Sequence, residues 1–165
     1  CDVVIGVGSL MGVRPPENFD LPFLARNVAD YWLRVHRSLT LWLTDYVFNP
    51  TYGAALRSPR LRGTPLLALA LSLMLTMLVS GLWHGTTSAF LVFGLLHGVY
   101  LVIHRSYGQV MARRMGRKEF ARWSERWSVR VPAVLLTFNL TSLAYVFFVL
   151  DLERALQVFG RLFAG

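Results

Sequence analysis

The chain has 165 residues, of which 55% are hydrophobic, and its mean hydropathy is positive at +0.47. This composition indicates a membrane protein, and the single cysteine excludes an intrachain disulfide framework. The formal net charge is +8. However, the basic residues flank apolar runs instead of forming a separate domain, so we expect membrane orientation to explain them and no nucleic-acid partner.

Residues 1–13 predict the end of a truncated membrane helix, because the chain opens on Cys1 and continues as an apolar stretch. A lipidated mature N-terminus at Cys1 is a less favoured alternative. Pro15 and Pro16 then end this helix, because proline disrupts helical hydrogen bonding. We expect residues 1–165 to be the C-terminal part of one membrane domain.

Residues 27–47 predict one amphipathic helix that begins at Asn27, a good N-cap residue. Apolar residues recur in this segment at steps of three and four, which places them on one face. His36 lies four residues after Trp32 and three before Leu39, so it shares the apolar face. We therefore expect His36 to point inward or into the membrane interface.

Three apolar runs predict transmembrane spans, at residues 65–83, 88–104 and 131–150. The first run contains no charge and would cover roughly 28 Å as a helix, close to the hydrocarbon thickness of a bilayer. Gly94 and Gly98 form a Gly-x-x-x-Gly pattern, which suits close packing of helices. The sequence therefore predicts an all-α, polytopic membrane helical bundle with amphipathic interfacial helices.

Charges beside these spans predict their orientation. Residues 105–130 carry eight basic and two acidic residues, and three arginines precede the first span. By the positive-inside rule, both segments are expected on the cytoplasmic side, with 105–130 as a basic interfacial segment. The short connection 85–87 then lies toward the opposite side, together with His84.

A seam of polar residues runs along the first span and ends at this histidine. Its members are four residues apart: Ser72, Thr76, Ser80 and His84. Lipid would not favour such a seam, so we expect it to face neighbouring helices or a cavity. Gly81 and Gly85 lack side chains beside the imidazole, which we interpret as access for a substrate or for another backbone.

An ionisable residue in a membrane span is costly and usually functional, so His84 is the leading candidate for chemistry. An unprotonated imidazole can act as a general base, taking the proton of an acceptor hydroxyl while its oxygen attacks an activated acyl carbon. His36 is the natural second group if it reaches the same cavity. No Gly-x-Ser-x-Gly motif supports a covalent serine route.

The other two histidines, His97 and His104, give a weaker indication of function. His97 and His104 lie seven residues apart on one helical face, but they have no nearby carboxylate or cysteine. Two imidazoles alone make a poor metal site, so we expect no metal. A packed histidine at position 97 and a helix-end histidine at position 104 are the favoured interpretations.

Several motifs together resemble one family. They are Pro16-Glu17-Asn18-Phe19, Pro22-Phe23-Leu24-Ala25-Arg26-Asn27, Tyr31-Trp32-x-Arg34-x-His36-x-Ser38-Leu39 and Ser80-Gly81-Leu82-Trp83-His84-Gly85. In this order they resemble the membrane-bound O-acyltransferase (MBOAT) family. The likeness is strongest to its bacterial branch of alginate O-acetylation and teichoic-acid D-alanyl transfer proteins.

The resemblance implies a ring of helices crossed by a tunnel, through which a cytoplasmic acyl donor meets an acceptor from the other side. It implies that His84 is the catalytic residue and His36 the second active-site group. The residues expected to line the tunnel are Ser80, Gly81, Trp83, Gly85 and Trp32. Family members are more than twice as long as this chain, which agrees with a C-terminal fragment.

We therefore expect an O-acyltransferase that moves a short acyl group, acetyl first, to a hydroxyl of a cell-envelope polysaccharide or an intermediate carrier. The expected co-substrate is an acyl-CoA or an acyl-carrier protein on the cytoplasmic side, with no bound cofactor. The acceptor is a polysaccharide or an extracellular acyl-accepting protein, and the expected location is the bacterial inner or plasma membrane. D-alanyl transfer to teichoic acid and a non-catalytic scaffold or permease fragment are the alternatives.

Overall fold

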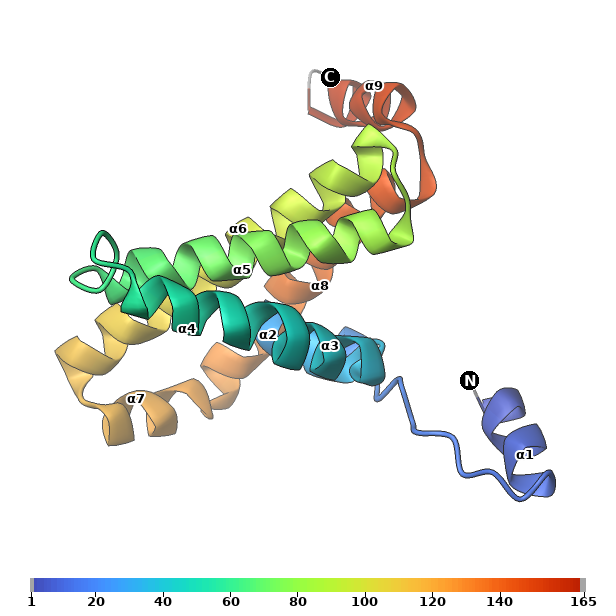
Figure 1. Cartoon of the computed structure of the whole chain (residues 1–165), viewed down its shortest axis with the longest axis horizontal. Helices are drawn as coiled ribbons and strands as arrows, with labels where there is room; N and C mark the ends of the chain where they lie inside the picture. Colours follow the sequence, from blue (N-terminus) through green and yellow to red (C-terminus); the bar gives the residue numbers. More distant parts are fainter. Residues whose placement is uncertain (1, 164–165) are drawn as a thin grey trace.

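A computed structural model describes residues 2–163, and within this range every regular element is a helix (Figure 1). The predicted all-α fold is therefore confirmed. In chain order the elements are α1 (Asp2–Leu10), the 3-10 helix η1 (Pro22–Leu24), α2 (Val28–Arg34), α3 (Arg37–Leu43), the π-helix η2 (Thr44–Phe48), α4 (Asn49–Arg57), α5 (Pro65–His84), α6 (Ser88–Met115), α7 (Arg117–Ser124), α8 (Trp127–Val149) and α9 (Leu152–Phe163).

Three of these helices, α5, α6 and α8, are long and apolar enough to cross a bilayer, and they coincide with the three predicted spans. α6 differs from the prediction for 88–104, because it continues to Met115. The basic residues after Arg105 end the apolar run but not the helix, since arginine is a good helix former. His104 therefore lies inside a helix, and its assignment as a helix-end histidine is wrong.

α5 and α6 pack closely against each other, and glycines of α6 make this possible. A Cβ atom built on Gly94 would lie 2.5 Å from the carbonyl oxygen of Met77, and one on Gly98 would lie 2.7 Å from the sulfur of Met74. Real Cβ atoms essentially never show distances this short, so a side chain at Gly94 would push the two backbones apart, and one at Gly98 would require the Met74 side chain to move. The Gly-x-x-x-Gly pattern thus serves the close packing expected of it.

The segment 27–47 does not form the single amphipathic helix expected from its periodicity. α2 ends at Arg34, Val35 is extended, and α3 starts after His36. The stripe still points inward, since Trp32, Val35 and Leu39 are all buried. The continuous helix was a wrong prediction, and its break falls at a candidate site residue.

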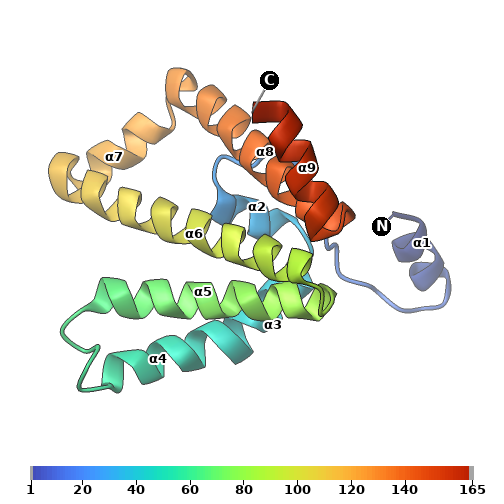
Figure 2. The same cartoon turned by 90° about the horizontal axis from the view of Figure 1, so that it is seen from above.

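The two ends of the bundle differ in charge. The loop between α4 and α5 lies at the same end as α7, on the left in Figures 1 and 2, whereas the turn between α5 and α6 lies at the other end near α9. The arginines of the loop and the basic segment 105–130 therefore share one end, and His84 lies at the opposite one. This arrangement agrees with the charge pattern, while the cytoplasmic side of the basic end stays a prediction.

α1 lies apart from the bundle, joined by an extended segment (Figures 1 and 2). Its apolar side chains, such as Val3 and Leu10, are exposed. At the other end of the chain, α9 returns to α8, with the rings of Phe147 and Phe159 stacked at 5.2 Å.

Candidate active site

His36 and His84, which are 48 residues apart in sequence, line the same small pocket of about 170 Å³. The pocket lies where the α2–α3 junction, α5, α6 and α8 converge. Its lining is otherwise aromatic and aliphatic and consists of Phe19, Tyr31, Trp32, Val35, His36, Leu39, His84, Phe93, Tyr145 and Phe148. The structure thus brings together the two histidines that the sequence proposed for one cavity.

The backbone of His36 has an unusual conformation, with φ 44° and ψ 53° in the left-handed region. Residues other than glycine adopt this region infrequently, because Cβ then crowds the following carbonyl, although histidine does so more often than most, as do asparagine and aspartate. Such strain persists only where the surroundings impose it, and it is concentrated at functional sites.

Hydrogen bonds on both sides of the α2–α3 junction hold His36 in this conformation. Asn18 accepts two hydrogen bonds from the start of α3: its backbone oxygen from the Arg37 N–H at 3.1 Å, and its Oδ1 from the Ser38 N–H at 2.9 Å. On the other side, the hydroxyl of Thr40 donates to the carbonyl of Trp32 at 2.8 Å. These bonds replace the helical ones that are lost at the break, and they fix the direction of the His36 side chain.

The imidazole of His36 is partly buried and lies against aromatic rings. Its ring centroid is 5.5 Å from that of Trp83 and 6.2 Å from that of Phe19. Its Nδ1 atom is buried and has no hydrogen-bond partner within residues 2–163. A buried polar atom without a partner is unusual, so this nitrogen is available to a bound molecule.

His84 is the last residue of α5, which places its imidazole at the end of the span. Aromatic rings from two other spans surround it: Phe93 of α6 at 6.0 Å and Phe148 of α8 at 4.8 Å between centroids. Its neighbour Trp83 is 55% exposed and contacts both imidazoles, at 5.5 Å from His36 and 4.7 Å from His84. Trp83 thus connects the two histidines from outside the pocket.

The polar seam of α5 faces the protein interior as expected, since Ser72, Thr76 and Ser80 are all buried. Ser72 and Thr76 donate to carbonyls of their own helix, at 2.8 and 2.7 Å. The hydroxyl of Ser80 has no partner in the described part of the chain. Ser80 is absent from the lining of the small pocket, so the structure gives no support to its assignment as a tunnel residue.

The two glycines beside His84 lie against Phe90 of α6. A Cβ atom on Gly81 would lie 2.4 Å from the carbonyl oxygen of Phe90, and one on Gly85 would lie 2.6 Å from the Phe90 ring. The space left by the missing side chains is therefore filled by α6. Gly81 and Gly85 allow α5 and α6 to approach, which agrees with the expected access for another backbone at Gly81, while their place in a tunnel wall stays a prediction.

Sequence reasoning missed part of the pocket. Tyr31 was placed on the apolar face but given no role, and Tyr145 and Phe148 lie within a uniformly apolar span where no signal distinguishes them. Burial raises the pKa of the Tyr31 phenol far above its usual value, and a hydrogen bond with Tyr145 adds to the rise. The phenol of Tyr31 therefore stays protonated and keeps a hydroxyl donor in the wall of the pocket.

His97 is the packed histidine that the sequence favoured. It is fully buried, its Nδ1 lies 3.0 Å from the carbonyl oxygen of Phe93, and its ring is 5.3 Å from that of Trp32. Because a carbonyl only accepts, Nδ1 carries the proton. His97 is outside the small pocket but directly behind one of its walls.

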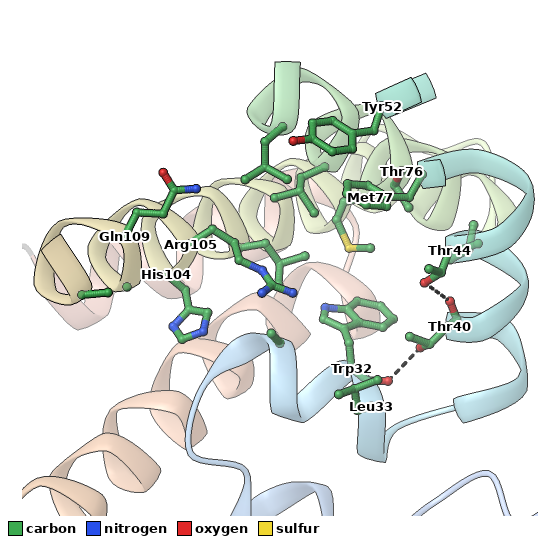
Figure 3. A pocket seen from close by; sticks show the side chains of 18 of the residues that line it. Trp32, Leu33, Thr40, Thr44, Tyr52, Thr76, Met77, His104, Arg105 and Gln109 are labelled. Carbon is green, nitrogen blue, oxygen red and sulfur yellow. Dashed lines mark hydrogen bonds between the residues drawn. The ribbon is translucent and has the colours of Figure 1, made fainter. Parts of the chain in front are cut away.

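A larger cavity of about 950 Å³ lies on the other side of Trp32, and Figure 3 shows its lining. Side chains of α6, among them His104, Arg105 and Gln109, lie on one side of it, and Thr40 and Thr44 lie on the other. Arg113 and Arg117 also line it, so the cavity reaches toward the basic end of the bundle.

Comparison with known proteins agrees with this geometry. The model of the family described as "MBOAT, membrane-bound O-acyltransferase family" matches residues 2–123, which include both histidines. The chain is 34% identical over 162 residues to a peptidoglycan O-acetyltransferase of Helicobacter pylori, an alignment that covers 96% of this chain and 27% of the relative.

Two other relatives carry related names. A probable alginate O-acetylase of Pseudomonas syringae pv. tomato is 32% identical over 164 residues, covering 99% of this chain and 27% of the relative. A teichoic acid D-alanyltransferase of Streptococcus thermophilus is 28% identical over 150 residues, covering 87% and 35%. The chain thus spans about a quarter to a third of the length of these relatives. The chain belongs to the membrane-bound O-acyltransferase family.

Proposed function

We propose that the protein transfers a short acyl group, acetyl, to a hydroxyl of a cell-envelope polysaccharide or of an intermediate carrier. The observation that carries this proposal is the pocket shared by His36 and His84. The similarity to relatives named for O-acetylation of peptidoglycan and alginate supports the choice of acyl group and acceptor.

In the proposed reaction, Nε2 or Nδ1 of His84 removes the proton of the acceptor hydroxyl. The oxygen attacks the acyl carbon of a thioester, forming the new C–O bond, and the C–S bond then breaks. The departing sulfur takes the proton from His84 and leaves as a thiol, so the histidine ends the cycle as it began. The aromatic rings around His84 keep water away, which favours transfer over hydrolysis.

His36 is proposed as the second active-site group. Its unpartnered Nδ1 is suited to bind or polarise the acyl carbonyl, or to orient the acceptor hydroxyl. The left-handed backbone of His36 is consistent with this role, because uncommon backbone conformations are concentrated at functional sites.

The proposed donor is a thioester of coenzyme A or of an acyl-carrier protein, which approaches the basic end from the cytoplasm. The acceptor, a polysaccharide or an extracellular acyl-accepting protein, reaches the His84 end. In this arrangement the protein is a multi-pass protein of the bacterial inner or plasma membrane. The separation of arginines and His84 at opposite ends of the bundle supports it.

The test replaces His84 by Gln in the protein produced from its own gene, with membrane insertion verified. Ester-linked acetyl on the envelope polymers, released by mild base and quantified, is expected to fall to the level of a deletion strain. Leu82→Ala is the control, because Leu82 lies on the same helix with 48% exposure and outside the pocket. Normal acetylation with His84→Gln overturns the proposal and favours a non-catalytic scaffold or transport role.

D-alanyl transfer to teichoic acid is the second candidate, and the similarity to the D-alanyltransferase of Streptococcus thermophilus favours it. The same hydrolysis separates the two, because D-alanine and acetate are released from different esters. Release of D-alanine that depends on His84, with acetate unchanged, selects the second candidate. Co-purification of a small acidic carrier protein would support it further.

A further inference from the structure

Trp32 is the one residue, within the described part of the chain, that lines both cavities. One of its sides bounds the pocket of about 170 Å³ with His36 and His84, and another bounds the cavity of about 950 Å³. In Figure 3 its indole lies between the side chains of α6 and those of Thr40 and Thr44. The indole is therefore the wall that separates a small reactive pocket from a large space.

This wall is held firmly. Trp32 is 5% exposed, and its ring meets those of His97 at 5.3 Å and Tyr31 at 6.1 Å, both edge-to-face. Its carbonyl accepts the hydrogen bond from Thr40 that also fixes the α2–α3 break. An indole fixed in this way defines a boundary, since aromatic side chains in such contacts have little freedom to move aside.

The indole also carries an unused polar atom. Nε1 of Trp32 is buried and has no hydrogen-bond partner among residues 2–163. Tryptophan N–H groups normally find an acceptor when buried. An unpartnered donor in the wall between two cavities indicates that a ligand with an acceptor oxygen, such as an acyl carbonyl, lies against it.

The space behind the wall suits an aliphatic chain. The larger cavity is lined by Leu43, Leu73, Met77 and Leu101, and also by polar and charged side chains such as Arg105. An acyl chain that extended beyond Trp32 would bury its methylene groups here, and each buried methylene favours binding. Trp32 lies between the histidine pocket and these aliphatic side chains.

We propose that Trp32 sets the length of the acyl group: its indole closes the histidine pocket so that only short acyl groups fit, and its removal joins the pocket to the larger cavity with its aliphatic side chains. The proposal rests on the acyltransfer function proposed above, and it adds the residue that selects the acyl chain. Trp32 acts here as a specificity-determining residue, because the acyl tail contacts it during transfer.

The experiment compares Trp32→Ala, Trp32→Leu and Trp32→Phe with the unchanged protein, each produced from its own gene and assayed in membranes. Each membrane receives acetyl, butanoyl or octanoyl groups, supplied both as coenzyme A thioesters and on acyl-carrier protein, and the acyl esters formed on the polymer are quantified. We expect the octanoyl-to-acetyl ratio to rise at least tenfold with Trp32→Ala, less with Trp32→Leu, and not with Trp32→Phe, which keeps a ring in the wall.

Trp42→Ala is the matched control, since Trp42 is 49% exposed and lines neither cavity. An unchanged ratio in a Trp32→Ala or Trp32→Leu protein that still transfers acetyl overturns the inference but leaves the proposed function intact. Loss of all transfer by both folded variants also overturns it, because the indole is then needed for transfer of any length. Absence of transfer by the unchanged protein with every donor overturns the proposed function itself.

Discussion

The indole of Trp83 stands edge-on to the imidazole of His36, with ring centroids 5.5 Å apart and planes at 89°. The same indole is edge-on to His84 at 4.7 Å. Trp83 therefore fixes the position of one histidine relative to the other, although 55% of it is exposed and it lies outside the pocket lining.

Replacing Trp83 by Ala is expected to lower kcat for acyl transfer about tenfold to a hundredfold, because misplacing catalytic groups by about 1 Å has effects of this size. Trp83→Phe keeps a ring between the histidines and should recover most of the rate. Stability should change little, since much of the indole is already exposed. Rates measured in membranes, with Trp127→Ala as the exposed control, check this; equal kcat for Trp83→Ala and the control would contradict it.

Two substitutions at His36 separate its backbone role from its chemical role. His36→Asn removes the imidazole but keeps a residue that tolerates the left-handed region, whereas His36→Val introduces a β-branched residue that does not. We expect both to lose most of the acyl transfer, and only His36→Val to lower the melting temperature in detergent. A full rate in His36→Asn would show that the imidazole takes no part in the reaction.

Asn18 holds the start of α3, and its loss should act through His36. Asn18→Ala removes the acceptor of the Ser38 N–H and is expected to cost about 1 kcal/mol, as for the loss of a helix cap. The rate of acyl transfer should fall by more than the loss of folding stability explains, because the His36 side chain is no longer held in its direction toward the pocket. Asn18→Asp keeps an acceptor oxygen and should restore both.

Urea or thermal unfolding in micelles and transfer assays measure the two effects of Asn18. Asn139→Ala is a suitable control, since the Asn139 side chain makes only an exposed hydrogen bond within its own helix. A fall in stability with an unchanged rate of transfer would remove the link between Asn18 and the site.

Gly81→Ala tests whether this glycine is needed for the close approach of α5 and α6. The added Cβ would meet the Phe90 carbonyl at 2.4 Å, so α5 and α6 must move apart, which should destabilise the protein by about 1 to 3 kcal/mol. Gly160→Ala adds a methyl where nothing lies within 4 Å and should be neutral or slightly stabilising. Melting temperatures of the two variants give the answer, and equal stability would favour the interpretation of Gly81 as open space.

Hydropathy predicted the three spans because each is an unbroken apolar run, which is a local property of the sequence. The end of α6 was predicted too early, because charge stops an apolar run at Arg105 while the helix itself continues to Met115. The candidate histidines were found because an ionisable group among apolar residues is conspicuous, and the family resemblance gave them their roles.

The break at His36 was missed because no glycine or proline marks it. It is set by hydrogen bonds from Asn18, eighteen residues before it in the sequence, and such contacts leave no local periodicity. The sequence left two alternatives for Gly81, a substrate or another backbone, for a related reason. A missing side chain shows that something comes close, but only the position of α6 shows that it is a backbone.

The length of α5 separates the arginine-rich end of the bundle from His84, and with them the proposed sites of donor binding and of reaction. Its 20 residues extend about 30 Å, from the arginine-rich loop at one end to His84 at the other. In the proposed function, a donor that binds at the arginine-rich end carries its acyl group across this distance before reaction. Changes to the arginines should therefore alter the donor concentration needed for half-maximal rate, while changes near His84 should alter the maximal rate itself.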